Sequence, residues 1–283
     1  MTEFADIEGG RIAYDVTGSG PLVVLSHGIG DRRQAYRFLV PRLAQAGYRV
    51  AVADLRGHGE SSMGLTSVTG KDAISRTDIA GDLLALIRHL GGPAVIVGHS
   101  ISGGAATIAA AMEPELVSGI VEINPFTRVQ KTNLGALLGN RRYRRGTVRM
   151  GGVVIFKSLR LWMSYLDVAY PTKPADYAGY MTALRAKLTE PGRMAEFLKT
   201  LKTTPADAEA QLPGIRCPAL IMMGTEDCDF ADPRAEGEAI AAAMPAGLST
   251  VTIIEGAGHY PHAQYPDQTA ALVIPFLAKY AHA

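Results

Sequence analysis

The sequence predicts an α/β protein in which a mostly parallel sheet carries helices on both faces. Two apolar runs, LVVL at 22–25 and AVIV at 94–97, suit strands that are buried on both sides. Short strands alternate with longer helical patterns early in the chain and again near its end. A long helical stretch interrupts this alternation, so the sequence predicts a helical insertion above a doubly wound core.

The predicted elements follow this alternation in order. Before the interruption we expect strands at Arg11–Val16, Leu22–Ser26, Arg49–Asp54, Ala94–Gly98 and Gly119–Asn124, and helices at Asp31–Ala46, Asp78–Leu90 and Ile101–Met112. The interruption contains helices at Lys157–Val168, Pro174–Leu188 and Gly192–Leu201, and strands and helices then alternate at Pro218–Met223, Pro233–Met244, Thr250–Ile254 and Pro266–Tyr280. The predicted domains are a core of residues 1–125 and 214–283 and a helical cap of residues 126–213.

The composition narrows the class of protein. Of 283 residues, 47% are hydrophobic and 19% charged, which is enough apolar material for a substantial core. A net charge of +1 gives no general attraction to nucleic acid or to an anionic membrane. The start MTEFADIEGG lacks the basic and apolar pattern of a secretion signal, and no apolar run reaches about 20 residues. With only Cys217 and Cys228, we expect no disulfide scaffold and a cytoplasmic location.

The motif GHSISGG at 98–104 indicates a nucleophile, because it lies between a predicted strand and a predicted helix. A serine on such a tight turn needs small neighbours so that the chain packs closely and exposes the hydroxyl. Gly98 precedes Ser100 by two residues, while Ser102 replaces the glycine that often follows by two. The amide of Ile101, at the start of the helix, is a natural donor to an oxyanion.

A second donor is expected from the loop SHGIGDRR at 26–33, and we select the Ile29 amide. His27 is interpreted as a buttress of this loop. The acid is expected in GTEDCDF at 224–230, with Asp227 favoured over Asp229 because it follows the strand sooner.

The base is expected to be His259, which follows a strand in the flexible segment EGAGHYPH at 255–262. A histidine titrates near pH 6.5 and can therefore take and return the serine proton at neutral pH. His262 is expected to begin the last helix, and His89 to lie on a helix surface.

Taken together, HGIGD, DLRGHGES, GHSISGG, GTED and GAGH resemble the α/β-hydrolase superfamily over nearly the whole chain. The resemblance implies an eight-stranded, mostly parallel sheet whose second strand is antiparallel. It also implies that Ser100, Asp227 and His259 form a catalytic triad, and that the backbones of Ile29 and Ile101 form the oxyanion hole. In that family the DLRGHGES-type loop is structural, so Asp54, Arg56 and His58 are not expected to be catalytic.

A serine at position 100 excludes the haloalkane dehalogenases and epoxide hydrolases of this fold, which use aspartate there. We expect a serine esterase acting on a small to medium, largely apolar carboxylic ester or related acyl compound. Thioesters and amides remain open, as do carbon–carbon hydrolysis of a ring-cleavage product, a ligand-sensing or signalling protein, and a biosynthetic lyase or cofactor-free oxygenase.

The predicted cap is basic. It has 15 Lys or Arg against 6 Asp or Glu, a net of +9, and the densest run is RRYRR at 141–145. We favour a solvated helix face over capture of an anionic substrate, because such closely spaced arginines cannot all face one pocket.

The aromatic residues of the cap, among them Trp162 and Tyr165, are expected mostly to pack between helices, with one or two lining the pocket. The expected partner is a small-molecule substrate, with no nucleic acid, membrane, cofactor or metal ion, and the sequence specifies no oligomeric state.

Overall fold

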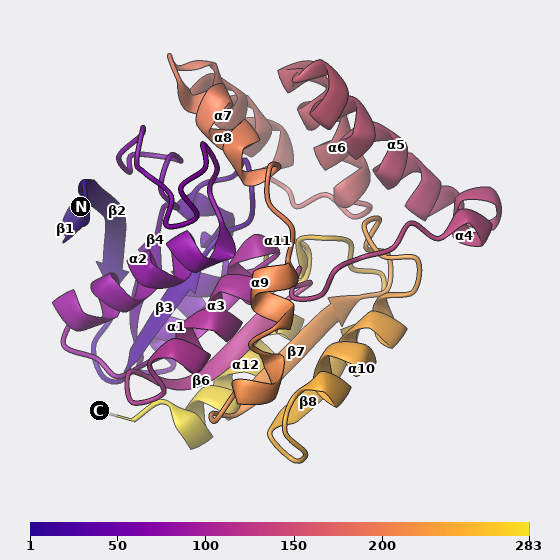
Figure 1. Cartoon of the computed structure of the whole chain (residues 1–283). Coiled ribbons are helices and arrows are strands. Elements are labelled where there is room, and N and C mark those ends of the chain that lie inside the picture. Colours follow the sequence, from indigo (N-terminus) through magenta and orange to yellow (C-terminus); the bar gives the residue numbers. More distant parts are fainter. Residues whose placement is uncertain (283) are drawn as a thin grey trace.

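The computed structural model describes residues 1–282, which are built around one eight-stranded sheet (Figure 1). The strands are β1 (Glu3–Ile7), β2 (Gly10–Thr17), β3 (Leu22–Ser26), β4 (Arg49–Ala53), β5 (Ala94–His99), β6 (Val117–Ile123), β7 (Ala219–Gly224) and β8 (Ser249–Ile254). Their spatial order is β1-β2-β4-β3-β5-β6-β7-β8. Strand β2 is antiparallel to both neighbours, and every pairing from β4 to β8 is parallel. The predicted α/β-hydrolase fold, with its antiparallel second strand, is confirmed.

Helices cover both faces of the sheet, and the alternation of side chains along each strand decides which helices they meet. The core helices are η1 (Arg33–Tyr36), α1 (Leu39–Gln45), α2 (Arg76–His89), α3 (Ile101–Met112), α10 (Pro233–Ala243), α11 (Pro261–Gln264) and α12 (Pro266–Tyr280). In β5, Ile96 packs in the cluster formed with α2, α3 and α10. Its neighbours Val95 and Val97 pack in the opposite cluster with α1 and α12. This two-sided burial is the reason that β5 reads as a continuous apolar run.

Between β6 and β7 the chain forms helices and no strand. We call residues 126–213 the helical insertion; its elements are α4 (Leu134–Gly139), α5 (Arg141–Phe156), α6 (Leu159–Ala169), α7 (Tyr177–Thr189), α8 (Arg193–Thr200), α9 (Ala206–Glu209) and η2 (Leu212–Gly214). Figure 1 shows α5 to α8 grouped together on one side of the sheet. Their buried cluster, which includes Trp162 and Phe197, also contains Cys228 and Tyr260 from the loops that follow β7 and β8. The insertion therefore lies over the carboxyl ends of the parallel strands.

The last part of the insertion packs differently. Ala208 of α9 and Leu212 of η2 belong to the cluster between the sheet and helices α2 and α3. By packing, α9 and η2 are thus part of the core, although their sequence continues the helical pattern. The division of the chain into the two predicted domains stays a prediction.

Strand β1 was not predicted, because only one of its five side chains, Ala5, is buried. A strand at the edge of a sheet buries little and carries no strong alternation of apolar residues.

The helix predicted at Asp31–Ala46 is wrong as one element, because the chain forms η1 and then α1. Pro41 lies in the first turn of α1. In a continuous helix the proline ring would clash with the preceding turn, so α1 starts anew at Leu39.

The helix predicted at Asp78–Leu90 begins two residues earlier, at Arg76. Ser75 accepts a hydrogen bond from the Asp78 amide, and the Asp78 side chain accepts one from the Ser75 amide. This capping box satisfies otherwise free amides and fixes the start of α2. Its signature, Ser-Arg-Thr-Asp, is visible in the sequence.

Helix α6 begins at Leu159 and not at the predicted Lys157, because Ser158 caps it and Lys157 adopts a left-handed backbone conformation with φ +50°. Helix α5, for which no bounds were predicted, is 16 residues long despite three glycines. At Gly146 a Cβ would lie 2.5 Å from the Cys228 carbonyl oxygen, so this glycine lets α5 approach the loop after β7. Within residues 1–282, no helix is both long and apolar enough to cross a bilayer.

Candidate active site

Ser100 occupies the turn between β5 and α3, with φ +57° and ψ −119°. This conformation is unfavourable for a residue with a Cβ, so the surrounding packing must hold it. Two glycines allow that packing. A Cβ on Gly98 would lie 2.2 Å from the Ser102 carbonyl oxygen. One on Gly103 would lie 2.5 Å from Pro125 Cβ. The turn thus places a strained serine at the end of a central strand and at the start of a helix.

Ser102, the departure from an all-glycine motif, is fully buried and hydrogen-bonded. Its hydroxyl donates to the His27 carbonyl oxygen at 2.6 Å and lies 2.9 Å from Ser26 Oγ. The serine therefore fits the turn and links α3 to the loop that follows β3.

That loop approaches the turn closely. A Cβ on Gly28 would lie 3.0 Å from Ser100 Cβ, which explains the need for glycine there. The amides of Ile29 and Ile101 donate to no protein acceptor within residues 1–282, and both residues line the same cavity as Ser100. Two free backbone donors that line the same cavity as a serine are what an oxyanion intermediate requires.

Two histidines and the only tryptophan fix this loop. The Gly30 amide donates to His58 Nε2 at 3.1 Å, and the Leu55 amide donates to His27 Nε2 at 3.1 Å. From the insertion, Trp162 Nε1 donates to the Gly30 carbonyl oxygen at 3.2 Å. Burial lowers the pKa of His27 to about 4 and also lowers the pKa of His58, so both rings stay neutral and accept these bonds.

The neighbouring DLRGHGES loop makes structural contacts throughout. Asp54 forms an ion pair with Arg33, and Arg56 binds both carboxylate oxygens of Asp82 at 2.6 Å.

In the loop after β8, His262 lies in α11 rather than at the start of the last helix and is fully buried. His89 is exposed on α2, as expected.

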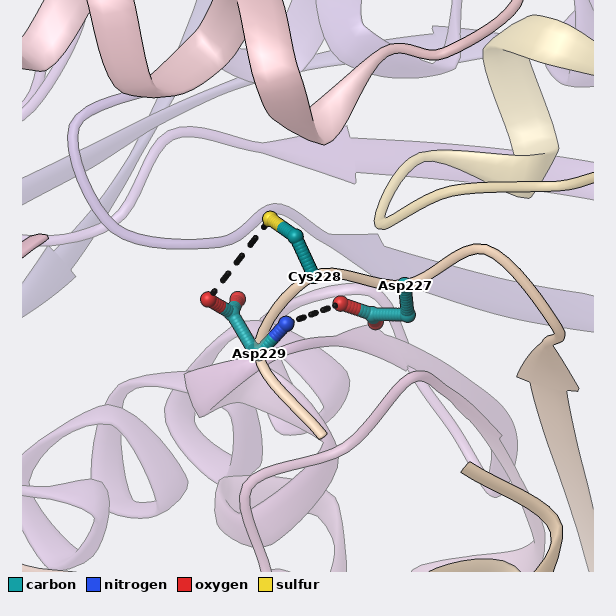
Figure 2. A group of neighbouring side chains, drawn as sticks. All are labelled: Asp227, Cys228 and Asp229. Atoms are coloured by element: carbon teal, nitrogen blue, oxygen red, sulfur yellow. Dashed lines mark hydrogen bonds between the residues drawn. The ribbon is translucent and has the colours of Figure 1, made fainter. Parts of the chain in front are cut away.

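His259 follows β8 and meets two carboxylates from the loop after β7. Its Nδ1 lies 2.7 Å from Asp227 Oδ2 and 3.4 Å from Asp229 Oδ2. Asp227 Oδ1 also accepts the Asp229 amide at 2.9 Å (Figure 2). Tyr165 of the insertion donates its hydroxyl to Asp229 Oδ2 at 2.5 Å. Asp227 therefore makes the shorter contact to the ring, while Asp229 is oriented partly by the insertion.

These charges set the protonation of the site. Burial alone would lower the pKa of His259, but the carboxylates of Asp227 and Asp229 raise it above its ordinary value. Burial raises the pKa of Asp229 to about 6. Within residues 1–282, His259 Nε2 has no hydrogen-bond partner, and the residue lines the cavity beside Ser100. The arrangement suits a ring that takes a proton on Nε2 while Nδ1 is held by a carboxylate.

Cys228 lies between the two aspartates, and the ligand atoms of these three residues fall within 4.8 Å of one another (Figure 2). The carboxylates already bind His259, Tyr165 and the Asp229 amide. Burial and the two acids raise the pKa of the Cys228 thiol well above its usual range. Cys228 is fully buried in the same cluster as Trp162 and Tyr165 of the insertion, so we interpret it as a packing residue.

Ser100, His259 and the residues of the two free amides, Ile29 and Ile101, all line one cavity of about 290 Å³. The core contributes Ser100 and His259 to its lining, and the insertion contributes Met150, Trp162 and Tyr165. The remaining lining is mostly apolar, and its polar members are three threonines, Gln130, Arg76 and the carboxylate of Asp229. A cavity of this size and composition accommodates a small to medium, largely apolar molecule.

That arginine, Arg76, was not singled out in the sequence. It is the first residue of α2, and the capping signature Ser-Arg-Thr-Asp would have placed it at the helix start. By contrast, none of the four arginines in RRYRR lines this cavity. Arg142 donates to the Phe230 carbonyl, and Arg144 donates to carbonyls of α4.

The model of the alpha/beta hydrolase family matches residues 23–272. The 2-(acetamidomethylene)succinate hydrolase of Mesorhizobium japonicum is 29% identical over 281 residues, which cover 96% of this chain and 94% of that protein. A thermophilic esterase from Thermogutta terrifontis superposes with a TM-score of 0.71 at 24% identity, covering 100% of both chains. The esterase RhEst1 from Rhodococcus sp. ECU1013 superposes with a TM-score of 0.75 at 22% identity, covering 99% of both chains.

Proposed function

The chain belongs to the alpha/beta hydrolase family, and we propose that it is a serine hydrolase that cleaves a small to medium, largely apolar carboxylic ester. In this proposal Ser100 is the nucleophile, His259 the general base and Asp227 the acid that orients it. The observation that carries the proposal is the strained Ser100 turn, which shares a cavity with a histidine bound at 2.7 Å to a buried aspartate.

The reaction follows from these positions. Ser100 Oγ attacks the ester carbonyl carbon while His259 Nε2 takes the hydroxyl proton, and the negative oxygen that develops is stabilised by the amides of Ile29 and Ile101. When this intermediate collapses, the alcohol leaves with the proton from His259 and the acyl group stays on Ser100. A water molecule then attacks the acyl-enzyme and gives its proton to His259. The acid departs as the proton returns to Ser100.

Asp227 supports this cycle through His259 Nδ1. Its carboxylate accepts a hydrogen bond from Nδ1–H, which keeps Nε2 free to act as a base, and it stabilises the imidazolium that forms during each step. The attraction between the Asp227 carboxylate and the imidazolium also explains why the pKa of His259 is raised.

A second candidate is hydrolysis of an amide or carbon–carbon bond by the same residues. The relative matched over nearly its whole length is a 2-(acetamidomethylene)succinate hydrolase rather than an esterase, and this favours keeping the candidate. Ester hydrolysis and this second candidate both need a serine, a base and an oxyanion hole, and they differ in the group that leaves.

Labelling with a fluorophosphonate tests the proposal directly, because the reagent reacts with activated serines. We expect stoichiometric labelling of the native protein, none of Ser100→Ala, and loss of ester turnover by a factor on the order of 10³ or more in the variant. Labelling that persists in Ser100→Ala would assign the nucleophile elsewhere. A panel of p-nitrophenyl esters, thioesters, anilides and a vinylogous diketone then ranks ester against the second candidate.

A further inference from the structure

Arg76 is buried in the wall of the proposed active-site cavity without a complete set of partners. Only 5% of its surface is exposed. Its Nε donates to the Phe126 carbonyl oxygen at 2.8 Å, but the buried Nη1 has no hydrogen-bond partner within residues 1–282. A buried charged donor without an acceptor is unfavourable, and a bound acceptor would remove that cost.

The other buried arginines of the chain show what Arg76 lacks. Arg33 forms an ion pair with Asp54, and Arg56 binds Asp82 through two hydrogen bonds of 2.6 Å. Arg76 has no carboxylate oxygen within 4.0 Å among residues 1–282. The buried guanidinium groups of Arg33 and Arg56 are therefore neutralised by aspartates, whereas the guanidinium of Arg76 in the cavity wall has no such partner within residues 1–282.

The charge of Arg76 is maintained at neutral pH. Burial lowers its pKa to about 10, and the charge of Asp207 counteracts this only in part. Asp207 Oδ2 already accepts hydrogen bonds from the amide and hydroxyl of Thr77 at 3.3 and 3.1 Å. The guanidinium is thus a cation, and the carboxylate of Asp207, which acts on it, is hydrogen-bonded to Thr77.

Helix α3 shapes the space in which this side chain lies. A Cβ on Gly104 would come within 2.8 Å of Arg76 Cδ and 2.7 Å of the Phe126 carbonyl oxygen. Only glycine at this position admits both groups. The last glycine of GHSISGG therefore serves the arginine, whereas Gly98 and Gly103 serve the Ser100 turn.

One residue, Phe126, connects Arg76 to the nucleophile. Its amide donates to the Ser100 carbonyl oxygen at 3.0 Å, and its carbonyl accepts from Arg76 Nε at 2.8 Å. With the length of one residue's backbone between these bonds, Arg76 Nε lies at most about 10 Å from the Ser100 main chain. A small molecule can span that distance inside the cavity.

We propose that Arg76 binds a carboxylate of the substrate, so that the substrate is an acid-bearing acyl compound such as the half-ester of a dicarboxylic acid. This inference rests on the proposed function and specifies its substrate class. A planar guanidinium with free Nη donors matches a carboxylate in shape and charge. Because the lining holds one arginine and also the acid Asp229, it suits one singly charged carboxylate better than a doubly charged phosphate.

The test compares esters that differ only in charge. p-Nitrophenyl hydrogen glutarate carries a carboxylate where p-nitrophenyl pentanoate carries a methyl group, and acetate esters of p-hydroxybenzoate and p-cresol place the same difference on the leaving group. Each pair is measured with native protein, Arg76→Met and the control Arg145→Met, which removes an exposed arginine outside the cavity. Spontaneous hydrolysis is subtracted.

For at least one pair, we expect the ratio of kcat/KM, charged over neutral ester, to fall about tenfold or more in Arg76→Met. The ratio should stay within about twofold in Arg145→Met, because an exposed charge far from the cavity is screened. Ratios that do not change in Arg76→Met for either pair would overturn the proposal and make Arg76 a structural residue. If Arg76→Met does not fold, Arg76→Lys serves in its place, because it keeps the charge and loses the planar fork.

Failure of the proposed function appears separately, as absence of fluorophosphonate labelling and of turnover with the neutral esters. In that case free glutarate still tests the Arg76 site. A rise in melting temperature with glutarate in the native protein, lost in Arg76→Met and kept in Arg145→Met, supports carboxylate binding. No rise in the native protein, an equal rise in Arg76→Met, or a rise with inorganic phosphate but not glutarate contradicts it.

Discussion

Asp229 Oδ2 lies 3.4 Å from His259 Nδ1, the same ring nitrogen that Asp227 Oδ2 contacts at 2.7 Å. The imidazole thus has a primary carboxylate and a second one beside it. The second carboxylate is hydrogen-bonded to Tyr165 of the helical insertion, so the protonation of His259 depends on both parts of the molecule.

Replacing each acid separately tests their division of work. Asp227→Asn should lower kcat for a neutral ester by about 10³ to 10⁴, because an amide in place of the carboxylate favours the wrong tautomer of His259. Asp229→Asn should cost no more than about tenfold, because Asp227 still holds the ring. Steady-state kinetics on p-nitrophenyl pentanoate provides the measurement. A larger loss in Asp229→Asn would make Asp229 the orienting acid.

The pH dependence of kcat/KM should report the raised pKa of His259. The base must be neutral, so activity falls as the pH drops through that pKa, and the acid limb should lie above the ordinary histidine value of about 6.5. Asp229→Asn removes one of the two negative charges that raise this pKa, so its acid limb should move to lower pH. Profiles of kcat/KM on a neutral ester between pH 5 and about 9 measure the acid limbs of the native protein and of Asp229→Asn. An acid limb that moves upward in Asp229→Asn would contradict this account.

Ser102→Ala should destabilise the protein, because it leaves the buried His27 carbonyl without the hydroxyl that donates to it at 2.6 Å. The expected loss is about 1 to 3 kcal/mol in the free energy of unfolding, measured by urea denaturation. Because the same bond ties α3 to the loop of Ile29, kcat should also fall, by less than in Ser100→Ala. Thr77→Ala, which loses a partly buried hydroxyl contact to Asp207, is a control that should leave kcat near its native value. Native stability and kcat in Ser102→Ala would show that the hydroxyl is dispensable.

The basic run of α5 should not select anionic substrates. Arg141, Arg144 and Arg145 are exposed and lie outside the cavity, so their joint replacement by glutamine should change kcat/KM for p-nitrophenyl hydrogen glutarate by less than about threefold. The neutral pentanoate ester should respond equally. A selective loss for the charged ester that disappears at high salt would instead give these arginines a role in substrate capture.

Much of this molecule follows from local sequence patterns. The buried strands β3 and β5 appear as unbroken apolar runs, because both of their faces are covered. The small residues around Ser100 indicate a tight turn, because any larger side chain would collide with the backbone. The sequence also favoured Asp227, which lies closer to His259 than Asp229 does. The catalytic roles of these residues stay predictions until kinetics tests them.

Other features arise only when distant segments meet. Strand β1 buries a single side chain, so it forms because β2 offers it a pairing edge rather than because of its own pattern. The contact of Tyr165 with Asp229 joins residues 64 positions apart.

Arg76 shows the same limit most clearly. In the sequence it is one charged residue near a helix start, where solvation is the ordinary expectation. The tertiary structure buries it against Phe126 and Gly104 and places no carboxylate oxygen of residues 1–282 within 4.0 Å of it. Local patterns determine which residues form strands, helices and tight turns, because those depend on neighbours along the chain. Burial and pairing of a charge depend on groups that only the folded chain brings together, and so the tertiary structure alone decided them.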